Sequence, residues 1–207
     1  MKDLKDMSLA ELWELFPIVL QEHNPDYTEW YEEEQAILFD TLKNYGVFRI
    51  SHIGSTSIQG LVAKPIVDIL LELENGYNKE AVVDVLQDNG WLVMAQDDSA
   101  QTIDLNKGYT LKGFAEKVYH LHIKPAGDWG ELYFRDYLRK HSDVAGEYER
   151  LKLRLKEKFE HNRDAYTDAK SNFIQQHTQT ARKEFGNRYC PSLSGSNSFC
   201  PTFSPTY

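Results

Sequence analysis

The stretch HIGSTSIQGLVAKPIVDILLEL, residues 52–73, joins a turn rich in glycine and hydroxyl side chains to an apolar run that holds one acid near its start, Asp68. The β-branched and aromatic residues of VFRISHI, 47–53, predict a strand that leads into the turn. Residues 64–73, KPIVDILLEL, predict a second strand after the turn signals of GSTSIQG. The order of strand, loop and strand decides the fold and places a carboxylate on the second strand.

Alternation along the strand predicted over 64–73 separates its side chains into two faces. One face takes Asp68, Leu70 and Glu72, and the other takes Val67, Ile69, Leu71 and Leu73. Asp68 therefore points away from the more apolar side of the sheet. Lys64 lies on the Asp68 face by the same parity, where its charge would offset that of a phosphate.

The turn between the two predicted strands has the residue types of a phosphate-binding loop. Gly54 lets the backbone approach a ligand closely. Ser55, Thr56 and Ser57 supply hydroxyl and amide groups that suit phosphate oxygens. With Asp68 one strand away, a divalent metal and a phosphate can meet here. The alternative is an ordinary turn, because glycine and serine are common in turns, and Asp68 would then pair with a lysine or an arginine.

A second chemical motif lies in VYHLHIK, residues 118–124, which also predicts a strand. Alternation puts His120, His122 and Lys124 on one face. If this strand neighbours the one that carries Asp68, two imidazoles and a carboxylate converge on one metal. That ligand set suits Mn, Fe, Ni or Zn better than Mg alone. The alternative is a pair of half-buried strand histidines, one of them bonded to Asp68 or to a backbone carbonyl.

Arg135 and Arg139 lie one turn apart in the helix predicted over 131–141, and Glu131 lies one turn before Arg135. A ladder of surface ion pairs accounts for this spacing. Contact with a phosphate is the alternative, because a guanidinium group can bind phosphate through two hydrogen bonds. Arg135 is therefore a candidate ligand-binding residue beside Lys64.

Helical patterns flank the strands. Ser8 and Glu11 have the spacing of a capping box and predict a helix over 9–16. A longer helix is predicted after Asp26, with a buried stripe of Trp30, Ile37, Leu38, Thr41 and Leu42, and another over 79–89. Three more helices are predicted, over 131–141, 143–159 and 164–185.

Further strands are predicted at 17–23, 91–95, 102–106 and 109–114, with turns at Gly108 and Gly113. The pattern as a whole predicts an α+β fold, in which a mixed β-sheet is flanked by helices and a C-terminal helical layer follows. Residues 1–186 are predicted to form one domain. Residues 187–207 hold one charge, Arg188, and no helix or strand period, which predicts a flexible tail.

Composition limits the classes of function. Of the 207 residues, 41% are hydrophobic and 27% are charged, as in ordinary soluble globular proteins, and no run approaches the roughly 18 apolar residues of a membrane span. The net charge of −9 argues against broad binding to nucleic acid. The first residues lack the basic region and apolar run of a secretion signal, so a cytoplasmic location is expected. Cys190 and Cys200 could pair with each other but cannot crosslink the core.

Three motifs, in order, resemble the GrpB family, a branch of the nucleotidyltransferase superfamily with the polymerase-beta-like fold. They are HIGSTSIQGLVAKPIVDILLEL, then YHLHI, then LYFRDYLRKHSDVAGEYERLKLRLKEKF with DAYTDAKSNFI. The resemblance covers about residues 17–175, and the agreement of three separate motifs argues against chance.

The resemblance implies a Gly-Ser loop that holds nucleotide phosphates and a strand acid that binds a divalent metal. Gly54, Ser55 and Asp68 match those positions. The expected ligand is a nucleotide or another phosphorylated small molecule, and the expected metal is Mg or Mn, with Zn, Ni or Fe as alternatives at the histidine pair. GrpB-like domains also occur fused after dephospho-CoA kinase, which implies a link to coenzyme A synthesis.

The sequence departs from the superfamily at one position that matters for catalysis. Active members carry a second acid two residues after the first, and here that residue is Leu70. Two-metal transfer needs enough carboxylates to hold both ions, and Glu72 lies roughly 6–7 Å further along the strand. Transfer of a nucleotidyl group, with Asp68 on the metal and His122 or His120 as a ligand or general base, stays open. So do a non-catalytic accessory or sensor domain and a metalloprotein unrelated to nucleotides.

Overall fold

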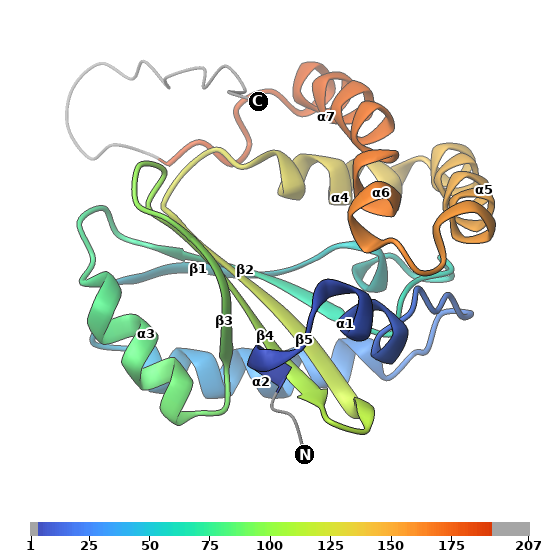
Figure 1. Ribbon diagram of the computed structural model, residues 1–207. Coiled ribbons are helices and arrows are strands. Elements are labelled where there is room, and N and C mark those ends of the chain that lie inside the picture. Colours follow the sequence, from blue (N-terminus) through green and yellow to red (C-terminus); the bar gives the residue numbers. More distant parts are fainter. Residues whose placement is uncertain (1–3, 192–207) are drawn as a thin grey trace.

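Five strands form one mixed sheet, and helices cover both of its faces (Figure 1). This computed structural model describes residues 4–191. The strands are β1 Val47–Ile53, β2 Val67–Leu73, β3 Leu92–Asp97, β4 Thr102–Thr110 and β5 Gly113–Pro125, in the order β1-β2-β5-β4-β3. β2 and β5 pair in parallel, and the other neighbours are antiparallel. The mixed sheet with its flanking helices confirms the predicted α+β class.

One face of the sheet packs against α2 Tyr27–Leu42 and α3 Lys79–Asp88 (Figure 1). The core between them takes Val67, Ile69, Leu71 and Leu73 of β2 with Tyr119, Leu121 and Ile123 of β5. Both sets follow the predicted alternation, because every second side chain of a strand points to the same face. The residues between them in each strand are therefore left on the opposite face.

α2 turns most of the predicted stripe toward this core, since Leu42 is buried and Trp30 packs against it. Leu38 is buried as predicted, but Ile37 is 47% exposed, while Tyr27 and Glu34 are buried. Burial of Glu34 is offset by Lys107 on β4, whose ammonium group donates to both carboxylate oxygens at 2.7 and 3.0 Å.

The other face of the sheet lies under a C-terminal helical layer, as predicted (Figure 1). Its helices are α4 Gly130–Lys140, α5 Ser142–Phe159, α6 Arg163–Asp168 and α7 Ser171–Phe185. Tyr133, Tyr148 and Ala181 from these helices share a core with Ile58 and Leu61 of the loop before β2. The last predicted helix is divided by a turn at 169–170 into α6 and α7. None of the helices within residues 4–191 combines the length and apolar character that crossing a lipid bilayer requires.

α1, Leu9–Leu15, begins at the predicted capping box. The N–H of Glu11 donates to Oγ of Ser8 at 3.3 Å, and the N–H of Ser8 donates to the Glu11 carboxylate at 2.7 Å. Two short 3-10 turns, Leu4–Asp6 and Ser55–Ser57, complete the described helical elements.

Residues 17–23 do not form the predicted strand. Gln21 makes one isolated β-bridge, and the rest of this segment pairs with no strand. Pro17 has no N–H for a ladder, and the N–H of Ile18 donates instead to the carbonyl of Glu160 in the helical layer at 2.9 Å.

β4 and β5 form one hairpin where three strands were predicted. Gly108 lies inside β4 at a register irregularity, with φ +89°, and a Cβ there would lie 2.3 Å from the carbonyl oxygen of Lys117. Glycine serves a bulge here rather than a turn. The chain reverses at residues 111–112, directly before Gly113.

The packed part of the chain extends beyond the domain boundary predicted at residue 186. The ring of Tyr189 stands edge-on to Tyr133, with centroids 5.2 Å apart, and also lies over the guanidinium of Arg49. Cys200 and the rest of the predicted tail lie outside the described residues.

Glu72 connects β2 to the neighbouring strand β1 and to the loop before α4. Its side chain is fully buried, and Arg49, its register partner on β1, donates to both carboxylate oxygens. The N–H of Gly127 donates to the same carboxylate at 3.1 Å. Every strong interaction of this acid is therefore internal to the fold.

Glu72→Ala is expected to lower the free energy of unfolding by about 3 kcal/mol or more, because it leaves the largely buried Arg49 without its counter-ion. Urea denaturation of the variant measures this loss. Glu74→Ala, two residues along at an exposed position, is the matched control and should change stability by less than about 0.5 kcal/mol. Equal losses in both variants would contradict the role given to Glu72.

Candidate functional site

Asp68, His120 and His122 meet on the sheet face that lies toward the helical layer. The parallel register of β2 and β5 sets Asp68 opposite His120 and Leu70 opposite His122. Nδ1 of His120 lies 3.1 Å from Oδ1 of Asp68. One ligand atom from each of the three residues lies within 4.8 Å of the others. The predicted neighbourhood of the two strands is confirmed, and it brings together the residues predicted as metal ligands.

The carboxyl group of Asp68 is held in its ionised form. Its side chain is 27% exposed. Burial opposes ionisation, but the hydrogen bond from His120 and the charges of His120, His122 and Lys64 lower the pKa of Asp68 to about 2. Asp68 is therefore an anion at neutral pH, which is the form that binds a metal ion.

Asp104 of β4 orients the second histidine. Its Oδ1 lies 2.7 Å from Nδ1 of His122, its register partner. Because a carboxylate accepts, Nδ1–H of His122 donates, and in the neutral imidazole Nε2 then has a lone pair, for which a metal would compete with a proton. Burial opposes the charge on His122, but the bond to Asp104 and the charge of Asp68 raise its pKa. Sequence reasoning missed Asp104, although alternation with the core residues Ile103 and Leu105 would have placed it on this face.

His120 is held on its far side by two residues that were not predicted. Nε2 of His120 lies 2.7 Å from the hydroxyl of Tyr109, and the two rings are stacked. Arg163 of α6 donates to the same hydroxyl at 3.1 Å. Burial lowers the pKa of His120, although its hydrogen bond to Asp68 opposes that shift. The chain from Arg163 through Tyr109 fixes the orientation of the imidazole beside Asp68.

Gly54 packs directly against the carboxylate. It has φ +68°, and a Cβ built on it would lie 2.1 Å from Oδ2 of Asp68. Only glycine fits this approach without moving the acid. The loop and the strand acid are therefore one structural unit.

The next two hydroxyls of the loop, which were predicted to bind a ligand, are used inside the protein. Oγ1 of Thr56 donates to the carbonyl of Ile66 at 3.1 Å, and Oγ of Ser57 donates to the carbonyl of Gly54 at 2.7 Å. Thr56 is 2% exposed and Ser57 is 9% exposed. These contacts fix the conformation of the loop. Among residues 54–57, Gly54 and Ser55 are the more accessible ones.

Besides Arg135, four cationic side chains line the pocket that holds Asp68: Lys64, Lys152, Arg163 and Lys170. Burial, followed by repulsion from neighbouring cations, lowers the pKa of Lys64 and that of Lys152 to about 7. Burial also outweighs the attraction of Asp68 and lowers the pKa of Lys170 to about 8. Asp68 attracts Lys64 and Lys170, and Glu149 attracts Lys152. For each of these lysines the attraction is smaller than the opposing effect of burial.

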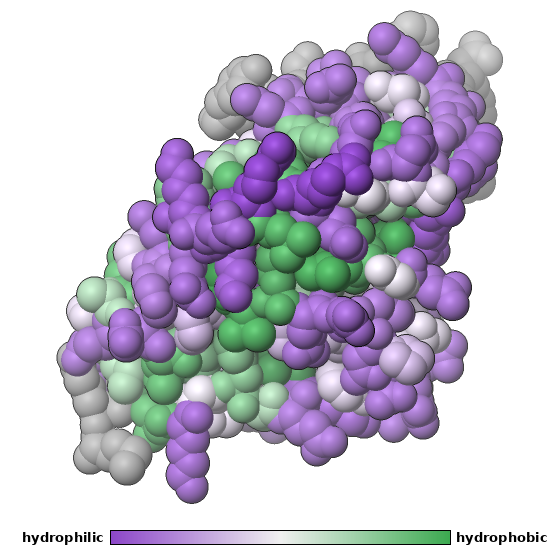
Figure 2. All heavy atoms as spheres, turned by 90° about the vertical axis from the view of Figure 1, so that its right-hand side faces the viewer, coloured by the Kyte–Doolittle hydropathy of each residue, from purple (hydrophilic) through white to green (hydrophobic). Residues whose placement is uncertain are grey.

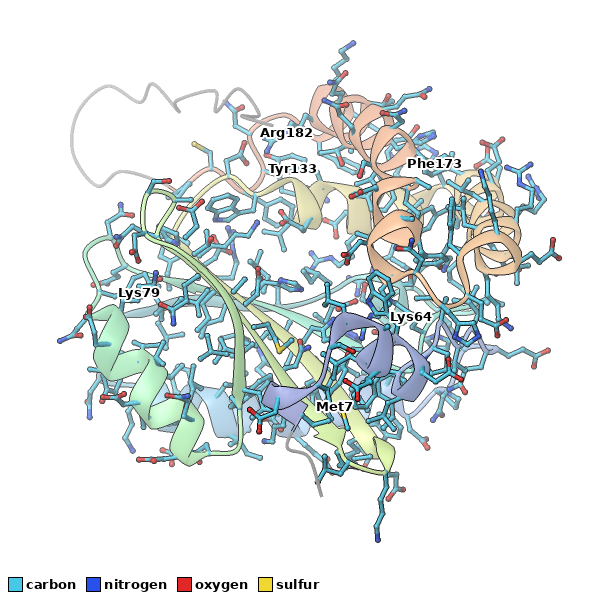
Figure 3. All side chains as sticks on the ribbon, in the orientation of Figure 1. Met7, Lys64, Lys79, Tyr133, Phe173 and Arg182 are labelled. Atoms are coloured by element: carbon cyan, nitrogen blue, oxygen red, sulfur yellow. The ribbon has the colours of Figure 1, made fainter. Side chains whose placement is uncertain are left out.

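Lys64 reaches this group from a position that differs from the prediction. β2 begins at Val67, so Lys64 lies in the loop before the strand rather than on it. In Figure 3 it lies beside α6, and its ammonium group is 5.7 Å from the centre of the Tyr166 ring. The ammonium group of Lys170 lies over the same ring at 4.3 Å. Lys152, 2% exposed on α5, donates to Oγ of Ser55 at 3.1 Å.

Arg135 lines the pocket, but protein groups occupy its donors. It donates to the carbonyl of His52 at 3.1 Å, to Asp136 at 2.9 Å and to the hydroxyl of Tyr189 at 3.0 Å. These contacts tie α4 to β1 and to the segment after α7. Binding of a ligand by Arg135 stays a prediction.

The pocket that holds these residues has a volume of about 1730 Å³. It is lined by the metal-type cluster, the four cations and the accessible part of the loop, and it continues along α1 and β3. Figure 2 shows apolar surface in the middle of this side of the molecule, between polar walls. Two imidazoles and one carboxylate at this spacing suit a single divalent ion of the Mn, Fe, Ni or Zn type. Both ring nitrogens of His120 are hydrogen-bonded, so a bound ion would replace one of these bonds.

The family model described as GrpB protein matches residues 17–180. This chain belongs to the GrpB family. The match confirms the resemblance seen in the sequence.

Relatives in the GrpB family include the glutamate-rich protein GrpB of Alkalihalophilus pseudofirmus, which is 31% identical over 76% of this chain and 91% of its own length. The UPF0157 protein PA4798 of Pseudomonas aeruginosa is 34% identical over 60% of this chain. This chain spans about half the length of PA4798 and of the UPF0157 protein YqkA of Bacillus subtilis, at 52% and 51%. The crystal structure of the conserved protein GrpB from Enterococcus faecalis has a TM-score of 0.68 and 31% identity, covering 81% of this chain and 99% of that one.

This GrpB family chain lacks the second acid that active nucleotidyltransferases carry. The residue at that position, Leu70, is part of the hydrophobic packing. Leu70 is fully buried against Ile53 and Leu132. Glu72, the other acid on this face of β2, forms an ion pair with Arg49. Asp68 is thus the acid that β2 offers to a metal.

Gly54→Ala is expected to lower the free energy of unfolding by about 2–4 kcal/mol, because the added methyl overlaps the Asp68 carboxylate and strains a left-handed backbone. Gly60→Ala is the matched control. It also has a positive φ, +77°, and nothing lies within 4 Å of the Cβ that alanine would add, so it tests alanine at a positive φ without the overlap. Chemical denaturation of both variants isolates the contact with Asp68. Equal losses would show that the close approach contributes nothing.

Proposed function

We propose that this protein binds a nucleotide or a related phosphorylated small molecule together with one divalent metal ion, which Asp68, His120 and His122 hold. The supporting observation is that a metal-type ligand set and four cationic side chains line one pocket. A metal ion and ammonium groups together neutralise the charge of a phosphate chain.

The donor set supports the metal part of this proposal. Asp68 is ionised, and the bond to Asp104 leaves Nε2 of His122 with its lone pair. The ion would polarise phosphate oxygens as a Lewis acid when bound. Ligand oxygens would complete its coordination, because three protein ligands leave positions open.

The charge balance supports the phosphate part. Lys64, Lys170 and Arg163 stand around Asp68, and burial already weakens the charged form of both lysines. An anionic ligand would restore their charge and satisfy their donors. Nucleotides have this chemistry. Coenzyme A precursors share it and belong to the proposal through the family resemblance, as does a cytoplasmic location.

Two roles fit such a site. Leu70 supports a non-catalytic accessory or sensor domain, because it leaves β2 with one available carboxylate. The superfamily resemblance supports transfer of a nucleotidyl group, with His122 as metal ligand or general base. An assay of product formation with metal and nucleotide separates the two roles.

Asp68→Asn is expected to abolish stabilisation by a nucleotide with metal, because it removes the charged metal ligand. At a ligand concentration 100-fold above Kd, the wild type should gain about 2.7 kcal/mol, which is roughly 5 °C or more in Tm for a chain of this size. Thermal unfolding is measured with nucleoside triphosphates or coenzyme A precursors, each with Mg, Mn, Zn or a chelator.

Asp84→Asn, exposed on α3 in the opposite layer, is the matched control and should respond as the wild type does. A folded Asp68→Asn variant with undiminished stabilisation would exclude the proposed site. Shifts with metal alone would favour a metalloprotein unrelated to nucleotides.

Asp104→Ala is expected to weaken metal binding about 10- to 100-fold, because His122 loses the partner that fixes its tautomer and orientation. Titration calorimetry with Mn or Zn measures this Kd without any assay of activity. Half of the Asp104 side chain is exposed, so the fold should tolerate the change. Unchanged affinity in Asp104→Ala, with Asp84→Ala as reference, would argue that His122 does not bind the ion.

A further inference from the structure

The pocket has an apolar side that the metal and phosphate groups do not use. We propose that Leu92 and Met94 of β3, together with Leu12 and Trp13 of α1, form a subsite for an apolar or aromatic group. This group would be the organic part of the same phosphorylated ligand. The inference rests on the proposed function and adds the class of group that the phosphates carry.

The register of the sheet sets the distance between the two ends of this site. Asp68 lies opposite His120, His120 lies opposite Asn106, and Asn106 lies opposite Leu92. One row of side chains thus crosses four strands on the pocket face. Three strand spacings make the separation between β2 and β3 about 14 Å. The row changes from charged to apolar at its far end.

β3 leaves its apolar side chains uncovered at that end. Leu92 is 43% exposed and Met94 is 57% exposed, and both line the pocket. Val93 between them is partly buried against the core and also borders the pocket. Two large apolar side chains on an edge strand favour contact with a ligand over exposure to water.

α1 supplies the facing apolar side chains. None of the residues Leu9–Leu15 is buried, although Leu12 and Trp13 line the pocket. The helix is anchored at its end by Phe16, whose ring lies 4.8 Å from that of Tyr109. Tyr109 in turn bonds His120, so the anchor connects this wall to the metal-type cluster.

The size of the pocket identifies the kind of occupant. Small-molecule sites measure about 300–1,000 Å³, and this pocket is larger. Lys64, Lys152, Arg163 and Lys170 suit the phosphate end, and the side chains of the apolar wall offer no charge to it. A ligand with a phosphate chain at one end and an apolar or aromatic group at the other matches both halves of the pocket.

The test compares tripolyphosphate with molecules that carry an organic group, namely the four nucleoside triphosphates and dephospho-coenzyme A. Titration calorimetry with Mn is done on the wild type and on the double variant Leu92→Asn with Met94→Asn. Both positions are exposed, and the change adds no charge. The control is the double variant Leu92→Met with Met94→Leu, which changes both side chains but keeps them apolar.

At least one organic ligand should bind the wild type tenfold or more tightly than tripolyphosphate does. The asparagine variant should lose that advantage, bind tripolyphosphate within twofold of the wild type, and differ from the apolar control. Equal binding of tripolyphosphate and every organic ligand by the wild type would overturn the subsite and leave the proposed function standing, as would an asparagine variant that keeps the advantage. Failure of the wild type to bind any of these molecules would overturn the proposed function itself.

Discussion

The parallel pairing of β2 with β5 is the constraint on which the rest of the structure depends. Because side chains alternate along a strand, its register sends Ile69 and Leu121 into the core and leaves Asp68 and His120 opposite each other on the second face. A slip of one residue in β5 would bury the imidazoles and expose leucine. The hydrophobic core and the metal-type cluster are therefore specified by the same pairing, so the site cannot be lost by sliding strands without unfolding the domain.

The local sequence pattern was sufficient to predict the features that depend on one strand and its turn. It identified β1, β2, the intervening loop, and the faces of Asp68, His120 and His122, because alternation is a property of adjacent residues. It did not identify Lys152, Arg163 and Lys170. These residues lie in α5, in α6 and in the turn before α7, more than 80 residues after the loop, and reach the pocket through tertiary packing. The strand predicted at residues 17–23 was wrong for the same reason, since the N–H of Ile18 donates to a carbonyl at the far end of α5.

Glu72 shows that a side chain can lie on the expected face of a strand and still be unable to bind a metal. Alternation put it on the same side as Asp68, and this was correct. Its carboxylate is nevertheless closed to a metal, because Arg49 and the N–H of Gly127 use its oxygens. Leu70, between the two acids, packs under α4 as part of the core. In a two-metal site both carboxylates would bind ions. In this chain Glu72 stabilises the fold, and Asp68 is the carboxylate that faces the pocket.

The electrostatics of the pocket run against those of the whole chain. The net charge is −9, yet Lys64, Arg163 and Lys170 lie around Asp68 in the pocket, which Lys152 also lines. Burying ammonium groups without partners costs free energy, which is why the pKa values of Lys64 and Lys170 are low. In the proposed function an anionic ligand would offset that cost, because each ammonium group would then have a partner. With a net charge of −9, such attraction would depend on this local group of cations and not on the charge of the whole chain.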